Sequence, residues 1–107
     1  MINVNPTITS LSESSAKLSG DLNAHTVTAL LPQGLKLLNQ APEAWLLDMT
    51  DVKQVSSAAV ALLLEWLKQA EQSNKRIEIT GMPEQMFSFI EICGLEPLFA
   101  PLFRTTS

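Results

Sequence analysis

The sequence predicts an α/β domain with a mixed sheet of four or five strands and three to four helices. After an irregular start at residues 3–6, two β-prone segments, residues 7–11 and 15–22, flank a turn-like stretch and suggest a hairpin. Apolar segments of strand length and helix length then alternate, which implies parallel strands joined by helical crossovers. The chain has 107 residues, 46% of them hydrophobic, so we expect one domain over residues 1–107.

The first half of the chain predicts the hairpin followed by one helix. Residues 15–22 alternate small or apolar side chains with polar ones, as a half-buried strand does. Residues 25–40 place a valine and several leucines at helical spacing behind Asn23, which is a plausible N-cap. Because Pro32 and Gly34 interrupt this spacing, we expect a kink there.

The second half predicts two strands and two helices in alternation. An apolar run of strand length at residues 44–49 is typical of a buried parallel strand. The clearest helix covers residues 56–74, and an alternating strand follows at residues 76–80. A last helix begins at Pro83 and ends before Gly94, a good C-cap. Residues 95–103 are apolar but split by two prolines, which predicts either a short strand or an irregular tail.

Composition argues against several classes of function. The net charge is −4, with 7 basic and 11 acidic residues, so binding to nucleic acid or to an anionic membrane surface is disfavoured. A single cysteine excludes an internal disulfide and fits a reducing compartment. The start has no pattern of a secretory signal, and the longest apolar run, residues 58–64, is far shorter than the roughly 20 residues that span a bilayer. We therefore expect a cytoplasmic protein without direct membrane insertion.

The residue types that carry catalysis are sparse. The chain has no GxxxxGK[ST] or GxGxxG loop and no pair of cysteines or histidines for a metal. The only histidine, His25, is interpreted as a surface or capping residue. Asp48 and Asp51 fall near the end of a predicted strand, where loop and cap hydrogen bonds explain them better than acid–base or Mg²⁺ chemistry. We predict no enzymatic activity, no catalytic residue, no metal and no cofactor.

Several large or sulfur-containing side chains are interpreted as core residues. Trp45 lies in the apolar strand, and Trp66 flanks the apolar side of the longest helix. Cys93 follows Met86, Phe87, Phe89 and Ile90 on an apolar helical stripe, which predicts a small buried hydrophobe and not a nucleophile.

Four stretches together resemble the STAS family of sulfate-transporter and anti-sigma-factor-antagonist domains. Residues 47–64 resemble its signature, a strand ending in Asp followed by a short loop and a Ser-Ser helix start. Residues 20–22, 76–81 and 93–99 resemble the family's second strand, later parallel strand and closing Gly-Leu pattern. The resemblance implies a STAS fold and a module that docks onto a partner protein.

Within that family the sequence is most similar to the MlaB-type subunit of a bacterial phospholipid ABC transporter. This implies a partner that is the transporter's ATPase subunit, a role in outer-membrane lipid asymmetry, and a position at the inner membrane only through that partner. The alternative is an anti-sigma-factor antagonist that binds a kinase-type anti-sigma factor and is regulated by serine phosphorylation. The position of the antagonists' phosphorylated serine matches Ser57, with Ser56 as a weaker second choice, but Ser56 stands where antagonists have Asp. That departure favours the MlaB-like interpretation.

The helix beginning at these serines also predicts a partner-binding surface. At 100° per residue, Ala58, Ala61, Leu62 and Glu65 lie on the side away from the predicted core, and with Ser56 and Ser57 they form the expected contact. Leu62 is either ordinary surface or an anchor that enters a pocket of the partner. On this helical phase Leu62→Asp leaves the domain folded, whereas Leu63→Asp unfolds it.

Overall fold

The computed structural model describes residues 7–102. Its strands are β1 (Thr7–Ser12), β2 (Ser15–Leu22), β3 (Ala44–Val55) and β4 (Arg76–Thr80). Its helices are α1 (Val27–Gln40), α2 (Ser57–Gln72), α3 (Glu84–Ile92) and α4 (Glu96–Phe99), and a 3₁₀ turn, η1 (Ala100–Leu102), follows α4. The predicted α/β class and the hairpin at its start are confirmed.

The four strands form one mixed sheet in the order β1-β2-β3-β4. Strands β1 and β2 pair antiparallel as the predicted hairpin, with Ile8 opposite Leu18. Strand β2 pairs parallel with β3, and β3 pairs parallel with β4 in a register that sets Trp45 opposite Ile77. Two parallel neighbours in succession require the helical crossovers that α1 and α2 provide.

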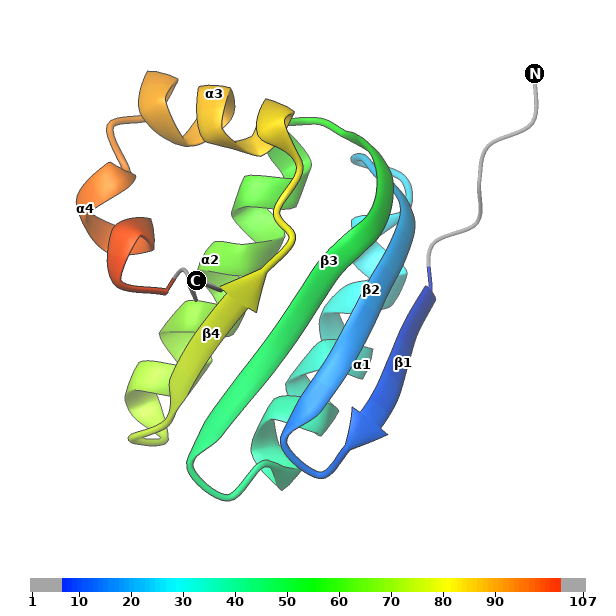
Figure 1. Cartoon of the computed structure of the whole chain (residues 1–107), viewed down its shortest axis with the longest axis vertical. Helices are drawn as coiled ribbons and strands as arrows, with labels where there is room; N and C mark the ends of the chain where they lie inside the picture. Colours follow the sequence, from blue (N-terminus) through cyan, green and yellow to red (C-terminus); the bar gives the residue numbers. More distant parts are fainter. Residues whose placement is uncertain (1–6, 103–107) are drawn as a thin grey trace.

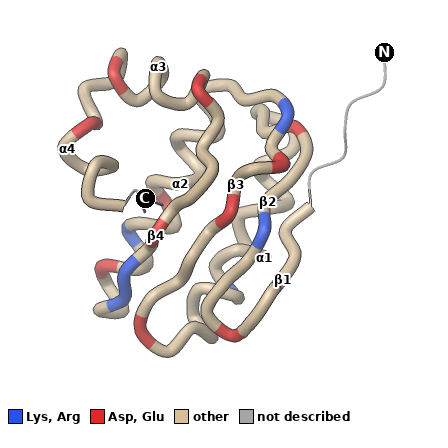
Figure 2. The backbone as a smooth tube through the Cα atoms, in the orientation of Figure 1, with Lys and Arg blue, Asp and Glu red and all other residues tan. Residues whose placement is uncertain are grey.

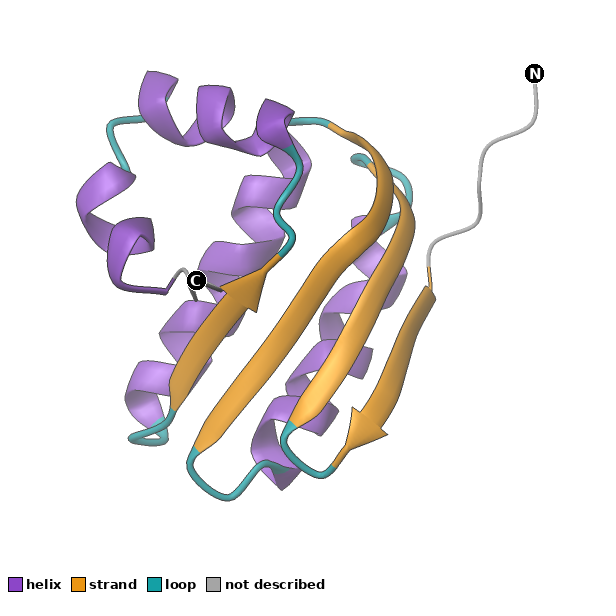
Figure 3. Cartoon of the chain, in the orientation of Figure 1, coloured by secondary structure: helices purple, strands orange, loops and turns teal. Residues whose placement is uncertain are grey.

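Helices α1 and α2 lie side by side behind the sheet, α3 lies past the C-terminal end of β4, and α4 lies beside the β4 edge (Figure 1). The near face of the sheet carries no helix in the described residues, as Figure 3 shows. Burial alternates along the strands in agreement with this arrangement. Leu18 of β2, Leu47 of β3 and Ile79 of β4 are fully buried, whereas the residues directly before and after each of them are only half-buried. The apolar strand at residues 44–49 is thus covered fully on one face only.

Both tryptophans lie in the core between the helices and the sheet, as predicted. Trp45 and Trp66 form an edge-to-face pair with ring centroids 5.5 Å apart and an interplanar angle of 82°. The Trp66 Nε1–H donates to the carbonyl oxygen of Leu31 at 3.1 Å and ties α2 to α1. A side chain at Gly34 would overlap the Trp66 indole ring, so this glycine allows α1 to approach α2 closely.

Several predicted elements differ from the structure. Strand β3 continues to Val55, so Asp48 and Asp51 lie inside a strand and not at its end. Helix α1 begins at Val27 and continues through Pro32 to Gln40. The C-terminal segment is neither a strand nor irregular, because Pro97 occupies an early position of α4, where proline is tolerated. The predicted irregular start at residues 3–6, and residue 103 of the tail, lie outside the described residues.

The predicted burial of Cys93 is wrong, and the predicted apolar stripe of the last helix is buried only in part. Met86 and Ile90 are buried, but Phe87 is exposed and Cys93 is an exposed free thiol. Helix α3 packs through the side that carries Met86 and Ile90, and Phe87 lies outside that buried side. Cys93 comes after the last helical residue, Ile92, at the C-cap position. The helical stripe therefore does not extend to it.

Candidate functional site

The start of α2 is fixed by Ser56. This residue has extended backbone angles, and its Oγ accepts a hydrogen bond from the Ala58 backbone N–H at 3.2 Å, which makes it the N-cap. Its own backbone N–H donates to the Leu22 carbonyl at 3.0 Å and ties the helix start to the end of β2. Ser57 is the first helical residue and is exposed. The two adjacent serines thus differ, because the Ser56 hydroxyl is engaged by the helix and the Ser57 side chain faces solvent.

The start of α1 lies beside it and is fixed by a second set of hydrogen bonds. The Asn23 Oδ1 accepts from the backbone N–H groups of His25 and Thr26 at 2.9 and 3.2 Å. The Thr26 hydroxyl donates to the Asp21 carbonyl at 2.7 Å. Asn23 therefore caps the turn that precedes α1, not the helix itself, and His25 is at the surface as predicted.

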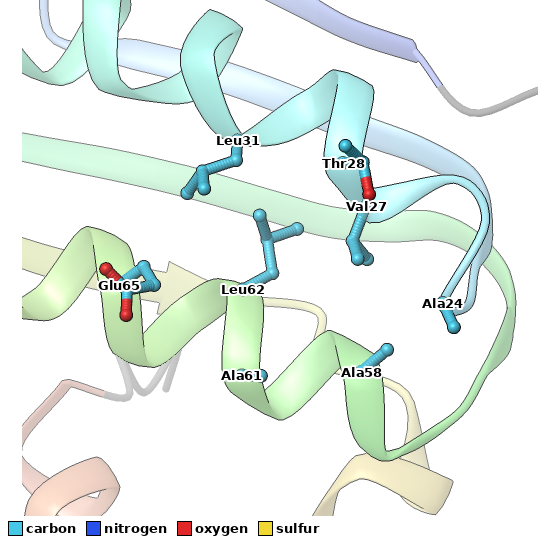
Figure 4. Close-up of a pocket in the computed structure, with 8 residues that line it drawn as sticks. All are labelled: Ala24, Val27, Thr28, Leu31, Ala58, Ala61, Leu62 and Glu65. Atoms are coloured by element: carbon cyan, nitrogen blue, oxygen red, sulfur yellow. The ribbon is translucent and has the colours of Figure 1, made fainter.

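Between the two helices lies an open groove of about 350 Å³, which we call the α1–α2 groove. Figure 4 shows side chains from both helices along it. Its lining comes from the start of α1 and the first half of α2: Ala24, Val27, Thr28, Leu31, Ala58, Ala61, Leu62 and Glu65. Most of these side chains are apolar or small. The groove is therefore an apolar hollow at the surface of the domain.

The expected exposure of Leu62 is wrong. Its side chain is 3% exposed, the same fraction as that of Leu63. In Figure 4 the Leu62 side chain points from α2 toward α1, where it forms the floor of the groove. Helix α2 packs against α1 as well as against the sheet, so its buried side is wider than the single stripe used to predict it. The expectation that Leu62→Asp leaves the fold intact is withdrawn on this ground.

The other predicted contact residues divide into two groups. Ala58, Ala61 and Glu65 line the groove with Leu62, and the two serines lie at the adjacent helix start. The contribution of α1 was missed, although Val27 and Leu31, one helical turn apart, were noted as apolar. Both are only half-buried, so they are available to line a surface groove.

The acidic residues of β3 are engaged away from this groove. Asp51 forms an ion pair with Lys17 across the sheet, with Nζ and Oδ2 2.8 Å apart, and this bond raises the pKa of Lys17. Asp48 Oδ1 accepts hydrogen bonds from the hydroxyl and the backbone N–H of Thr50, and these bonds lower the pKa of Asp48. Over residues 7–102 no group of three or more His, Cys, Asp or Glu side chains could hold a metal ion.

The chain is an α/β domain in which two adjacent helices cover one face of a four-stranded mixed sheet. Its candidate site is the apolar groove between the starts of these two helices. The family described as "Mlab, STAS domain" matches residues 9–101 of the chain. Since this is most of its length, the chain belongs to the STAS domain family, and the predicted family is confirmed.

Solved structures give the same fold. The chain is similar to the anti-sigma factor antagonist SpoIIAA in its unphosphorylated form, with a TM-score of 0.71 and 14% identity over 95% of this chain and 88% of that one. It is also similar to the Bacillus cell fate determinant SpoIIAA in the phosphorylated form, with a TM-score of 0.69 and 15% identity over 95% and 91% of the two chains. A comparison with curated proteins gave no match. Within residues 7–102 no helix is both long and apolar enough to cross a membrane.

Proposed function

We propose that this chain is a non-catalytic docking subunit that binds the ATPase of a phospholipid-transporting ABC system. In this role it is a cytoplasmic accessory protein, held near the inner membrane through its partner, and serves outer-membrane lipid asymmetry. One observation carries the proposal: an open apolar groove adjoins the start of α2 in a chain that belongs to an MlaB-type family.

The lining of the groove supports binding and not chemistry. Of the described residues that line it, only Thr28 and Glu65 have a polar side-chain group, and none is a histidine or a cysteine. A partner side chain of leucine size gains roughly 1.5–3 kcal/mol when it is fully buried in such a site. Leu62, expected to be an anchor that enters the partner, instead forms part of the pocket. The partner therefore supplies the anchor.

The alternative function is a signalling antagonist switched by phosphorylation of Ser57. The observation in its favour is the exposure of Ser57 at the first position of α2, where the helix dipole stabilises a phosphate. A phosphate there would stand beside Ala58 at the edge of the groove and would repel an acidic partner. The presence of Ser56 where antagonists have Asp weakens this alternative.

The test measures binding of the purified ATPase subunit of a phospholipid-transporting ABC system from the same organism, by isothermal titration calorimetry. Ala61→Trp fills the groove and is expected to abolish binding, whereas Ala29→Trp, on the exposed side of α1, is expected to leave it unchanged. Circular dichroism checks that both variants are folded. Equal binding by both variants would exclude the groove. Phosphate transfer from a kinase-type anti-sigma factor to the wild type, lost in Ser57→Ala, would favour the alternative.

A further inference from the structure

The cleft between α1 and α2 continues beyond the apolar groove. A second hollow of about 210 Å³ is lined by Leu35, Glu65, Lys68, Gln69 and Gln72. Glu65 belongs to both hollows, so they adjoin along α2. The cleft is therefore apolar at the Ala58 end and polar at the Gln72 end, with a carboxylate at the junction. In Figure 4, Glu65 lies at the end of the groove away from Ala24 and Ala58.

At the polar end of this cleft, hydrogen bonds join α2 and the residues that follow it to α1. The Gln69 side-chain amide donates to Asn39 Oδ1 at 3.3 Å and to Ser73 Oγ at 3.2 Å. The Lys75 ammonium group donates to the carbonyls of Leu38 and Asn39 at 3.1 and 2.6 Å and closes the end of α1. Together with the bond from Trp66 to Leu31, these contacts hold the spacing of the two helices. The cleft is pre-formed, which lowers the entropic cost of binding.

The charge at the junction is available to a ligand. Among the described residues that line the apolar groove, Glu65 is the only ionisable one, and its side chain is exposed. Lys68 lines the adjoining polar hollow. In the described part of the chain, no salt bridge joins Glu65 to Lys68, the nearest lysine along α2. A cation from a ligand that lies in the apolar groove would therefore meet an exposed carboxylate.

The length of the cleft sets the size of the occupant. Gln72 lies 14 residues after Ala58, so the side of the cleft formed by α2 is about 21 Å long at 1.5 Å per residue. A helical segment of about four turns matches this length and can present apolar side chains along one face. The occupant then needs apolar residues over its first two turns and a cation next to them.

We propose that the cleft binds an amphipathic helix of the partner protein, whose apolar side chains fill the α1–α2 groove and whose Lys or Arg pairs with Glu65. This inference rests on the proposed docking function and adds the chemistry of the partner segment. In this proposal Glu65 selects for a basic partner segment. Ala58 and Ala61 have small side chains, which let the partner helix approach α2 closely.

The charges of the chain itself argue against a second copy as the occupant. The exposed apolar side chains Phe87 and Ile92 lie on α3, but residues 77–102 contain four glutamates and no Lys or Arg. Figure 2 shows acidic and no basic positions along α3 and α4. Docking α3 in the cleft of another copy would bring like charges together at Glu65. A surface of anionic phospholipid is disfavoured by the same carboxylate.

The experiment extends the titration of the ATPase subunit to charge variants of the cleft. Glu65→Lys is expected to weaken binding by about tenfold, because it sets a cation against the partner's cation. Glu65→Gln removes the attraction alone and is expected to weaken it by about threefold and to reduce its salt dependence. Glu71→Lys, an exposed site on α2 that does not line the cleft, is the matched control and is expected to bind normally.

Carbodiimide coupling identifies the partner residue. The reagent activates the Glu65 carboxylate, a partner lysine amine attacks it to form an amide bond, and the reagent leaves as its urea. Mass spectrometry is expected to map this crosslink to a basic amphipathic segment, and Glu65→Gln is expected to lose it.

The outcomes separate the two proposals. Loss of binding in Ala61→Trp with normal binding in Glu65→Lys would overturn the selection by charge and leave the docking function standing. If the wild type does not bind the ATPase subunit, the proposed function fails, and the same variants are then titrated with a kinase-type anti-sigma factor. Binding of neither partner, or binding that no cleft variant changes, would overturn the inference.

Discussion

Helices α2 and α3 have similar apolar patterns but very different surroundings. Of its 16 residues, α2 buries six, and these face the sheet and both neighbouring helices: Ala59, Val60, Leu62, Leu63, Trp66 and Ala70. Of its nine residues, α3 buries only Met86 and Ile90. The number of neighbouring elements, and not the apolar pattern alone, sets how many sides of a helix are covered.

The exposures of Leu62 and Phe87 depart from the apolar pattern in opposite directions, and this difference explains both. Leu62 was expected at the surface and is buried, because α1 covers a second side of α2. Phe87 belongs to the predicted apolar stripe of α3 and is exposed, because α3 packs through the side that carries Met86 and Ile90. The apolar pattern of a helix predicts one side that is buried. It does not predict whether another helix packs against a second side.

The largest expected effect is on α2. Leu62→Asp and Leu63→Asp should both unfold the domain or destabilise it by more than about 3 kcal/mol, because each removes a buried leucine and buries a charge. Urea denaturation followed by circular dichroism measures this. A Leu62→Asp variant as stable as the wild type would mean that α1 does not cover this side of α2, and the comparison of the two helices would fail.

An intermediate effect is expected where α1 meets α2. Gly34→Ala should destabilise the domain by about 1–3 kcal/mol, although alanine favours a helix over glycine by about 1 kcal/mol. The new methyl group would overlap the Trp66 ring. Thermal denaturation compares this variant with the same change in a Trp66→Phe background, where the smaller ring should reduce the cost. A stabilising Gly34→Ala would show that α1 and α2 are further apart than described.

The smallest effect is expected on α3. The Ile92 side chain is 81% exposed, so Ile92→Ser should change the free energy of unfolding by no more than about 0.5 kcal/mol. The same urea titration detects it, with Ile90→Ser, at a buried position of the same helix, as a destabilised control. A loss above about 1 kcal/mol at Ile92 would show that the outer side of α3 is covered, and the contrast with α2 would disappear.

Local periodicity was enough to predict most of the fold. Strand propensity predicted β1, alternation predicted β2 and β4, and helical spacing with end signals predicted α1, α2 and α3. Strand β3 was predicted too short because the polar residues from Thr50 to Gln54 break the apolar run, yet pairing of Leu22 with Val55 keeps the strand extended. Helix α4 was missed because Pro97 was interpreted as a breaker when it lies at the helix start.

Only one wall of the candidate site, the one formed by α2, could be predicted from the sequence. The α2 wall was visible because Ala58, Ala61 and Glu65 share one helical phase. The α1 wall lies about thirty residues earlier in the chain, and its contact with α2 depends on the Gly34 and Trp66 packing. Such a contact is set by tertiary structure, and no local pattern in the sequence contains it.

The edge-to-face tryptophan pair gives this domain a built-in optical reporter. The chain has two tryptophans and no tyrosine, so its intrinsic emission comes from Trp45 and Trp66 alone. The Trp66 indole is hydrogen-bonded to Leu31, and Leu31 also lines the groove. A ligand that displaces Leu31 would change the polarity around one indole and shift the wavelength and intensity of emission. Occupancy of the groove could therefore be followed by fluorescence without a label or an added chromophore.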